Sequence, residues 1–150
     1  MTRVRPSLDG HGRDGRRGWP LLAIAVSEPA GLSPLELQRV LLLVGQKREE
    51  QIGPGFYEFR GNGNDSNPAS PALFADMDAL VAAEYLLKEW VPEAASSVLR
   101  LSDAGRAWAM EFRRRVKKEA LAGLEDAVAW VREQSHLDRV HKTSTVRVIG

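Results

Sequence analysis

The sequence contains no cysteine among its 150 residues. This absence excludes disulfide bonds, thiol catalysis and cysteine-ligated zinc, and it is typical of proteins from a reducing compartment. Long apolar runs are also missing. The longest run near the N-terminus, Trp19–Val26, has eight residues, whereas a membrane-spanning helix needs about 20. We therefore expect a cytoplasmic protein that has no membrane partner.

Neither sign of charge dominates, because 21 Lys and Arg residues stand against 20 Asp and Glu residues and the net charge is +1. This balance alone indicates neither a nucleic-acid nor a membrane partner. Histidine is scarce as well, and His11, His136 and His141 all fall near the ends of the chain. Such a set indicates neither a metal site nor a general base. We therefore expect no metal, no cofactor and no enzymatic activity.

The hydrophobic residues, 43% of the chain, are sufficient for one buried core. We expect a single domain over residues 19–135. Residues 1–18 carry five arginines, two aspartates and four glycines, a composition that predicts a flexible basic arm. Residues 136–150 are polar and rich in threonine, so we expect a poorly ordered polar tail there.

Two helices have clear start signals. Ser33 precedes a proline and Glu36 follows three residues later, which is a capping box and predicts a helix over 33–47. The serine–proline pair recurs at Ser70 and predicts a second helix over 70–84. Apolar residues recur along both segments at helical spacing: Leu37, Val40, Leu41 and Val44 in the first, and Leu73, Met77, Leu80 and Val81 in the second.

The remaining elements are a short helix, a hairpin and a long helical region. We expect the short helix over 19–27 and the hairpin strands over 85–90 and 97–101. Ser102 should cap a helical region in which Gly123 marks a break between two helices. The fold class predicted from this order is mainly α with a small β-hairpin: a winged helix-turn-helix-like single domain with a long C-terminal helical region.

Several segments carry a resemblance to known families. Ser70–Leu86 and Val98–Arg106 resemble the recognition helix and wing exit of PadR-like and MarR-like regulators. The series Leu37–Val44, Phe56–Phe59 and Ser70–Phe74 is similar to the phage-associated, Panacea-type antitoxin domains and their winged-helix relatives. The resemblance implies a winged-helix fold and a regulatory function.

The predicted helix over 70–84 lies where such regulators read DNA, yet it carries Asp76, Asp78 and Glu84 and no basic residue. A DNA-reading helix needs basic or amide side chains on its outer face. We therefore interpret Asp76 and Asp78 as an exposed acidic face for a basic protein partner; an ordinary solvated face is the alternative. Three nearby aromatic residues either contact the same partner or belong to the core: Phe56, Tyr57 and Phe59.

Basic residues cluster in the long helical region instead. Arg113 and Lys117 are i, i+4 neighbours, as are Arg114 and Lys118, so we expect one exposed patch. Such a patch can follow a phosphate backbone, with Arg100 of the hairpin adding to it. A solvated helix face explains the same run equally well.

The leading hypothesis is a small non-catalytic regulatory protein that acts by protein binding, in the manner of an antitoxin or adaptor, with a toxin or a regulated protein as its partner. The alternative is a DNA-binding transcriptional regulator of the winged-helix type. A homodimer through the terminal helices is a further option, and Trp130 either takes part in it or packs in the core.

Overall fold

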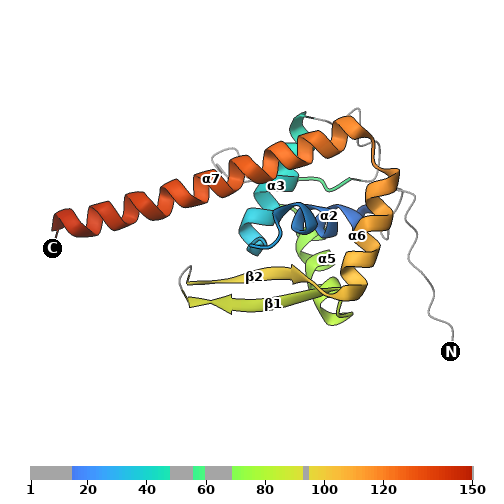
Figure 1. The fold of residues 1–150 in the computed structure, drawn as a ribbon, viewed down its shortest axis with the longest axis horizontal. Coiled ribbons are helices and arrows are strands. Elements are labelled where there is room, and N and C mark those ends of the chain that lie inside the picture. The colour runs from blue at the N-terminus through green and yellow to red at the C-terminus, as the bar shows by residue number, and fades with distance from the viewer. Residues whose placement is uncertain (1–14, 48–55, 60–68, 93–94, 150) are drawn as a thin grey trace.

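The computed structural model describes residues 15–47, 56–59, 69–92 and 95–149, with the backbone alone for 47 and 139–149. Over these ranges the protein is mainly helical with one antiparallel hairpin, which confirms the expected combination of helices with a small hairpin (Figure 1). The elements are α2 (Gly18–Ser27), α3 (Pro34–Lys47), α5 (Pro71–Ala82), β1 (Leu86–Val91), β2 (Ser96–Leu101), α6 (Asp103–Arg115) and α7 (Lys118–Ile149).

Serine side chains begin three of the helices, as predicted. At α3 the Ser33 hydroxyl accepts from the Glu36 amide at 3.1 Å, and the Glu36 carboxylate accepts from the Ser33 amide at 2.9 Å. Ser70 accepts from the Leu73 amide at α5, and Ser102 does the same for the first turn of α6. These bonds satisfy amides that have no partner within the helix, so local sequence alone sets where the helices begin.

Helix α2 lies at the centre of the core (Figure 1). Its residues are apolar on every side, which is typical of a helix buried all round. It packs mainly against α6 and also against α3, α7 and β2. Near its start, the Trp19 ring meets the rings of Phe56 and Phe112 edge-on, with centroids 5.6 and 5.1 Å apart.

The hairpin is joined to the helices through the connection between α2 and α3. Strands β1 and β2 pair from Leu86 opposite Leu101 to Val91 opposite Ser96. Leu32 adds an antiparallel bridge to Leu99, whose amide donates to the Leu32 carbonyl at 2.7 Å. Gly31 makes this approach possible, because its φ is +77° and a Cβ there would lie 2.7 Å from the Leu99 carbonyl oxygen.

The predicted break at Gly123 is wrong, and the chain turns at Val116 and Lys117 instead. Val116 is extended, with φ −77° and ψ 137°, and ends α6. Three arginines occupy the last turn of α6, where cations interact favourably with the helix dipole. Gly123 lies inside α7, because packing outweighs the modest helix penalty of one glycine.

The ends of the chain also differ from expectation. Residues 1–14 lie outside the described residues, but 15–18 are not a free arm: Gly15 and Gly18 are buried and α2 begins at Gly18. At the other end, the segment from His136 that we expect to be a polar tail continues the backbone of α7 to Ile149. Residues 56–59 form an extended segment that belongs to neither a helix nor a strand.

Candidate functional site

Helix α5 presents two faces of different chemistry. Its inner face packs on the core through Leu73, Met77 and Leu80 and includes Asp76. The outer face exposes Phe74, with 38% of its surface accessible, together with Asp78 and several small or rigid residues: Pro71, Ala75 and Ala82. None of the twelve residues of α5 is basic. The exposed face is therefore apolar and acidic.

The prediction that Asp76 and Asp78 share an exposed face is wrong for Asp76, whose exposed fraction is 0%. Asp76 lies three residues after Leu73 and four before Leu80, which places it on the buried stripe of α5. Asp78 lies on the exposed side. Only Asp78 of this pair can meet a partner from solution without local opening of the fold.

Three side chains satisfy the buried carboxylate of Asp76. Arg16 Nε donates to Oδ2 at 2.9 Å and Arg17 Nε donates to Oδ1 at 3.0 Å. The Tyr57 hydroxyl donates to Oδ2 at 2.7 Å. We call Asp76, Arg16, Arg17 and Tyr57 the Asp76 cluster. It joins the segment before α2, the extended segment 56–59 and α5, which are distant in sequence.

The electrostatics of the Asp76 cluster favour the ionised carboxylate. Burial by itself would raise the pKa of Asp76, but the hydrogen bonds from Arg16, Tyr57 and Arg17 outweigh it and lower that pKa. Burial and the adjacent carboxylate raise the pKa of Tyr57, so the phenol stays protonated and acts as a donor. Burial opposes the charge of Arg16, but the hydrogen bond to Asp76 prevails and raises its pKa.

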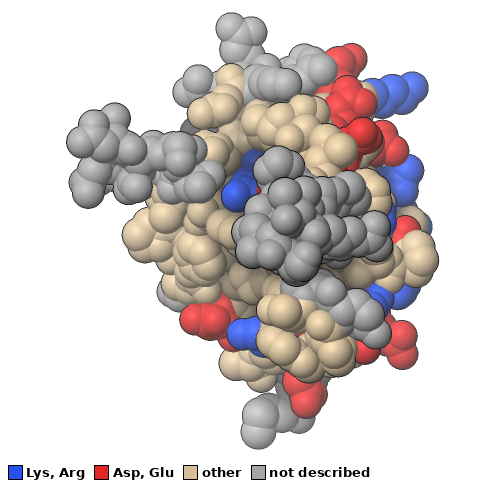
Figure 2. All heavy atoms as spheres, turned by 90° about the vertical axis from the view of Figure 1, so that its left-hand side faces the viewer, with Lys and Arg blue, Asp and Glu red and all other residues tan. Residues whose placement is uncertain are grey.

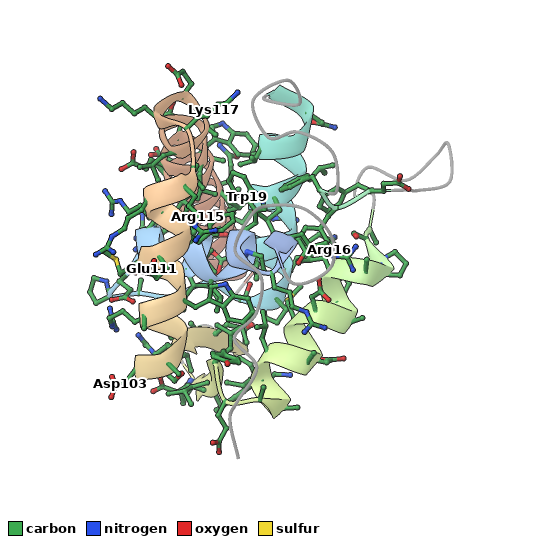
Figure 3. The ribbon with its side chains drawn as sticks, turned by 90° about the vertical axis from the view of Figure 1, so that its right-hand side faces the viewer. Arg16, Trp19, Asp103, Glu111, Arg115 and Lys117 are labelled. Carbon is green, nitrogen blue, oxygen red and sulfur yellow. The ribbon has the colours of Figure 1, made fainter. Side chains whose placement is uncertain are left out.

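The Asp76 cluster anchors the chain just before α2. The Arg16 guanidinium also lies over the Tyr57 ring, 5.1 Å from its centroid, a cation–π geometry. Figure 3 shows Arg16 on the α5 side of the molecule, away from α6. Sequence reasoning missed both arginines, although a signal existed. An aspartate on an apolar stripe needs buried partners, and two arginines precede the most apolar helix.

The aromatic residues that were candidates for partner contact belong to the core instead. Tyr57 is buried and bonded to Asp76, so it is not available to a partner. Phe56 and Phe59 are half-buried and pack against the core, where Phe56 meets the ring of Trp19. Of the two interpretations given for these residues, the structure supports core packing.

The basic run surrounds the junction of α6 and α7. Arg113, Arg114, Lys117 and Lys118 are all exposed, and Arg114 pairs with Glu111 at 2.9 Å. In Figure 3, Arg115 and Lys117 lie at the end of α6 opposite Asp103.

Arg100 does not join the four basic residues at the junction of α6 and α7. Helix α6, about 20 Å long at 1.5 Å per residue, separates Arg100 from that junction. Arg100 bonds to Glu89 at 2.5 Å and to the carbonyl of Pro29.

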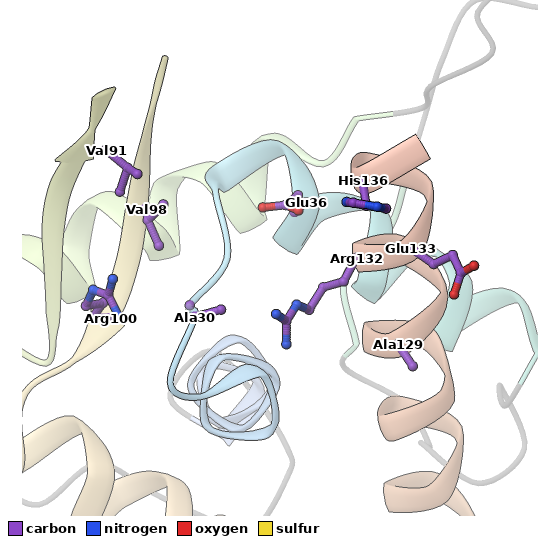
Figure 4. Close-up of a pocket in the computed structure, with 10 residues that line it drawn as sticks. Ala30, Glu36, Val91, Val98, Arg100, Ala129, Arg132, Glu133 and His136 are labelled. Carbon is purple, nitrogen blue, oxygen red and sulfur yellow. The ribbon is translucent and has the colours of Figure 1, made fainter. Parts of the chain in front are cut away.

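A cavity of about 690 Å³ lies between the hairpin, the α2–α3 connection and α7 (Figure 4). Arg132 extends into it from α7 and donates to the Ser27 carbonyl at 3.4 Å, and Arg100 borders it from β2. Glu36 already binds the Ser33 amide. The lining mixes both signs of charge with small apolar residues, and Glu36, Arg100 and Arg132 already bind other groups of the protein.

Two tryptophans are exposed, one on the hairpin and one on α7. Trp90 of β1 is 62% exposed and Trp130 of α7 is 55% exposed, so Trp130 is not a core residue. Figure 2 shows the end of the molecule from which the hairpin and α7 project, where uncharged residues form much of the described surface. Large exposed aromatic side chains of this kind commonly mark interaction surfaces.

Comparisons of the chain with known protein families, with curated proteins and with solved structures find no match. In the part of the chain that the structure describes, no three His, Asp or Glu side chains gather as metal ligands would. No helix in that part is both long enough and apolar enough to cross a membrane. The exposed surfaces are therefore the features from which a function can be inferred.

Proposed function

We propose that this protein is a non-catalytic regulator with a winged-helix fold that acts by binding another protein, in the manner of an antitoxin or adaptor. The order α2, α3, α5, β1, β2 supports the winged-helix assignment, as does the Leu32–Leu99 bridge that ties the hairpin to the helices. The connection from α3 to α5 spans residues 48–70, longer than the three- or four-residue turn of a simple helix-turn-helix.

The outer face of α5 is the observation that carries this proposal. In a helix-turn-helix protein the second helix enters the major groove and touches bases and phosphates. Here that helix exposes Phe74 and Asp78 and has no cation to meet a phosphate. An exposed phenylalanine beside a carboxylate suits a protein partner with an apolar pocket and a basic rim.

Site-specific photocrosslinking tests the proposal directly. A photoreactive phenylalanine analogue replaces Phe74 in cells, and the matched control places it at Leu35 of α3, which is 48% exposed. We expect a discrete protein adduct at position 74 and none at position 35. The purified partner should then bind Asp78→Lys about tenfold more weakly or worse, a loss of at least 1.4 kcal/mol. Absence of any protein adduct at 74 would refute the assignment of α5.

DNA binding through the basic run is the second candidate, because Arg113, Arg114, Lys117 and Lys118 are exposed next to one another. Affinity of this kind is insensitive to sequence and falls steeply with salt. The test is fluorescence anisotropy with a random duplex and with the DNA upstream of the gene. Tight binding to upstream DNA at physiological salt, lost in the variant with Glu at 113, 114 and 117, would favour this candidate over protein binding.

A further inference from the structure

Helix α7 extends well beyond the rest of the molecule (Figure 1). Its first half packs on α3 and α2 through a buried stripe: Ala120, Leu124, Ala127, Val128 and Val131. No described side chain after Val131 is buried. The following 18 residues correspond to about 27 Å of helix. Over residues 132–138 the described side chains therefore give α7 no buried apolar contact with its own domain.

Exposed apolar side chains mark the start of this projecting part. Trp130 is 55% exposed and Leu137 is 49% exposed. They are seven residues apart, so they lie on the same side of the helix at the spacing of a helix–helix contact.

The last eleven residues of α7 have a composition that disfavours an isolated helix. Six of the residues 139–149 are β-branched: Val140, Thr143, Thr145, Val146, Val148 and Ile149. Such residues have low helix propensity, and helices in proteins derive most of their stability from packing. A helix through this segment would therefore gain most of its stability from a packing partner.

The charge pattern along α7 is complementary to a second copy of the same helix. Residues 118–138 hold five acidic and two basic residues, whereas residues 139–149 hold three basic residues and no acidic one. Two copies of this helix side by side in parallel would place like charges together. In antiparallel orientation the basic end of each copy lies along the acidic part of the other.

We propose that a second copy of this chain pairs with α7 through an antiparallel α7–α7 contact centred between Trp130 and Leu137. The exposed apolar pair supplies the centre of the contact, and the opposed charges of the two halves set its direction. This inference does not depend on the outer face of α5, which lies on a different element.

Sedimentation equilibrium tests the self-association. The wild-type chain should be a dimer, and Trp130→Glu should weaken the dimer about tenfold or more. Trp90→Glu is the matched control, since Trp90 is similarly exposed, at 62% against 55%, but lies on the hairpin. A wild-type chain that stays monomeric, or a dimer that Trp90→Glu disrupts and Trp130→Glu does not, would overturn the proposal. Circular dichroism verifies that both variants are folded.

Single cysteines test the direction, and the natural chain has none to interfere. In an antiparallel pair, two copies of Gln134→Cys lie near the symmetry axis and should form a disulfide. Two copies of Lys142→Cys lie about 25 Å apart at 1.5 Å per residue, far beyond disulfide reach. Efficient crosslinking at 142 would refute the antiparallel arrangement.

Charge exchange tests the complementarity independently. One variant carries Lys in place of Glu125, Asp126 and Glu133, and the other carries Glu in place of Arg139, Lys142 and Arg147. Each variant alone should be largely monomeric, because both halves of its α7 then have the same sign. A mixture of the two should form a heterodimer. If each variant alone dimerises like the wild type, the charge argument is wrong.

Discussion

Asp76→Asn is the substitution that tests the central packing argument most sharply. The native carboxylate is fully buried and accepts three hydrogen bonds, two from arginines and one from Tyr57. Asparagine has nearly the same size but no charge, and its amide nitrogen is a donor where the carboxylate had an acceptor. The variant therefore places a donor against donors and leaves two cations without their counter-ion.

The expected cost follows from these contacts. Breaking a buried ion pair by removing one partner costs about 3–5 kcal/mol. The side chains of Arg16 and Arg17 retain 25% and 17% of their exposure, so water can solvate them in part. We therefore expect the lower end, about 3 kcal/mol, which is a large share of a typical folding free energy of about 5–15 kcal/mol.

Urea denaturation measures this effect. A loss of about 3 kcal/mol should lower the midpoint by about 1–3 M urea with an unchanged slope. Tyr57→Phe removes one bond but keeps both arginines, so it should cost less, about 1–3 kcal/mol. Asp78→Asn, on the exposed face of the same helix, should change stability by no more than about 0.5 kcal/mol. A midpoint for Asp76→Asn equal to that of Asp78→Asn would refute the role of the Asp76 cluster.

Three further predictions follow from the geometry. Folding lowers the pKa of Asp76. The stability that the ionised carboxylate adds to the fold should therefore be complete above the unfolded pKa of about 3.9 and be lost as the pH falls through the folded pKa. Acid titration of the wild type and of Asp76→Asn, followed by circular dichroism, checks this direction. Glu84 follows the C-cap of α5 in the left-handed region, with φ +64°, so Glu84→Gly should raise the unfolding free energy, measured in urea, by about 0.5–1 kcal/mol. Gly105→Ala should destabilise by about 3 kcal/mol or more, since its Cβ would lie 2.0 Å from the Tyr85 carbonyl oxygen; a thermal midpoint equal to wild type would contradict that contact.

Local signals predicted the helix starts well. The capping serines at Ser33, Ser70 and Ser102 and the apolar spacing of α3 and α5 depend only on residues within a few positions of one another. The hairpin followed from its two short strand segments in the same way. Elements whose determinants are close in sequence can be read without knowledge of the tertiary structure.

The Asp76 cluster could not be read in this way, because its members are 59 and 60 residues apart for the arginines and 19 for the tyrosine. An acidic residue in an amphipathic helix is normally exposed. The position of Asp76 on the apolar stripe of α5, between Leu73 and Leu80, is the only local sign that its carboxylate is buried. The assignment of Asp76 to a partner surface is wrong because the net charge of a whole helix does not show on which face each charge lies.

The break between α6 and α7 also depends on contacts between segments that are distant in sequence. Gly123 has the lower helix propensity, yet the chain turns at Val116. The turn lets α6 pack on α2 while α7 crosses α3. A difference in propensity of about 1 kcal/mol for one glycine is small compared with the apolar area that this arrangement buries.

Asp76 and Asp78 are two residues apart, but substitution of Asp76 should lower mainly stability and substitution of Asp78 should lower mainly partner binding. Asp76 holds α5 against the segment before α2, whereas Asp78 only faces outward. If the outer face of α5 binds a partner, Asp78→Lys should weaken binding at unchanged stability. Asp76→Asn should weaken binding only to the extent that it loosens α5. A substitution that lowers partner affinity in proportion to stability therefore marks a residue that supports the binding face. A substitution that lowers affinity alone marks a residue that contacts the partner.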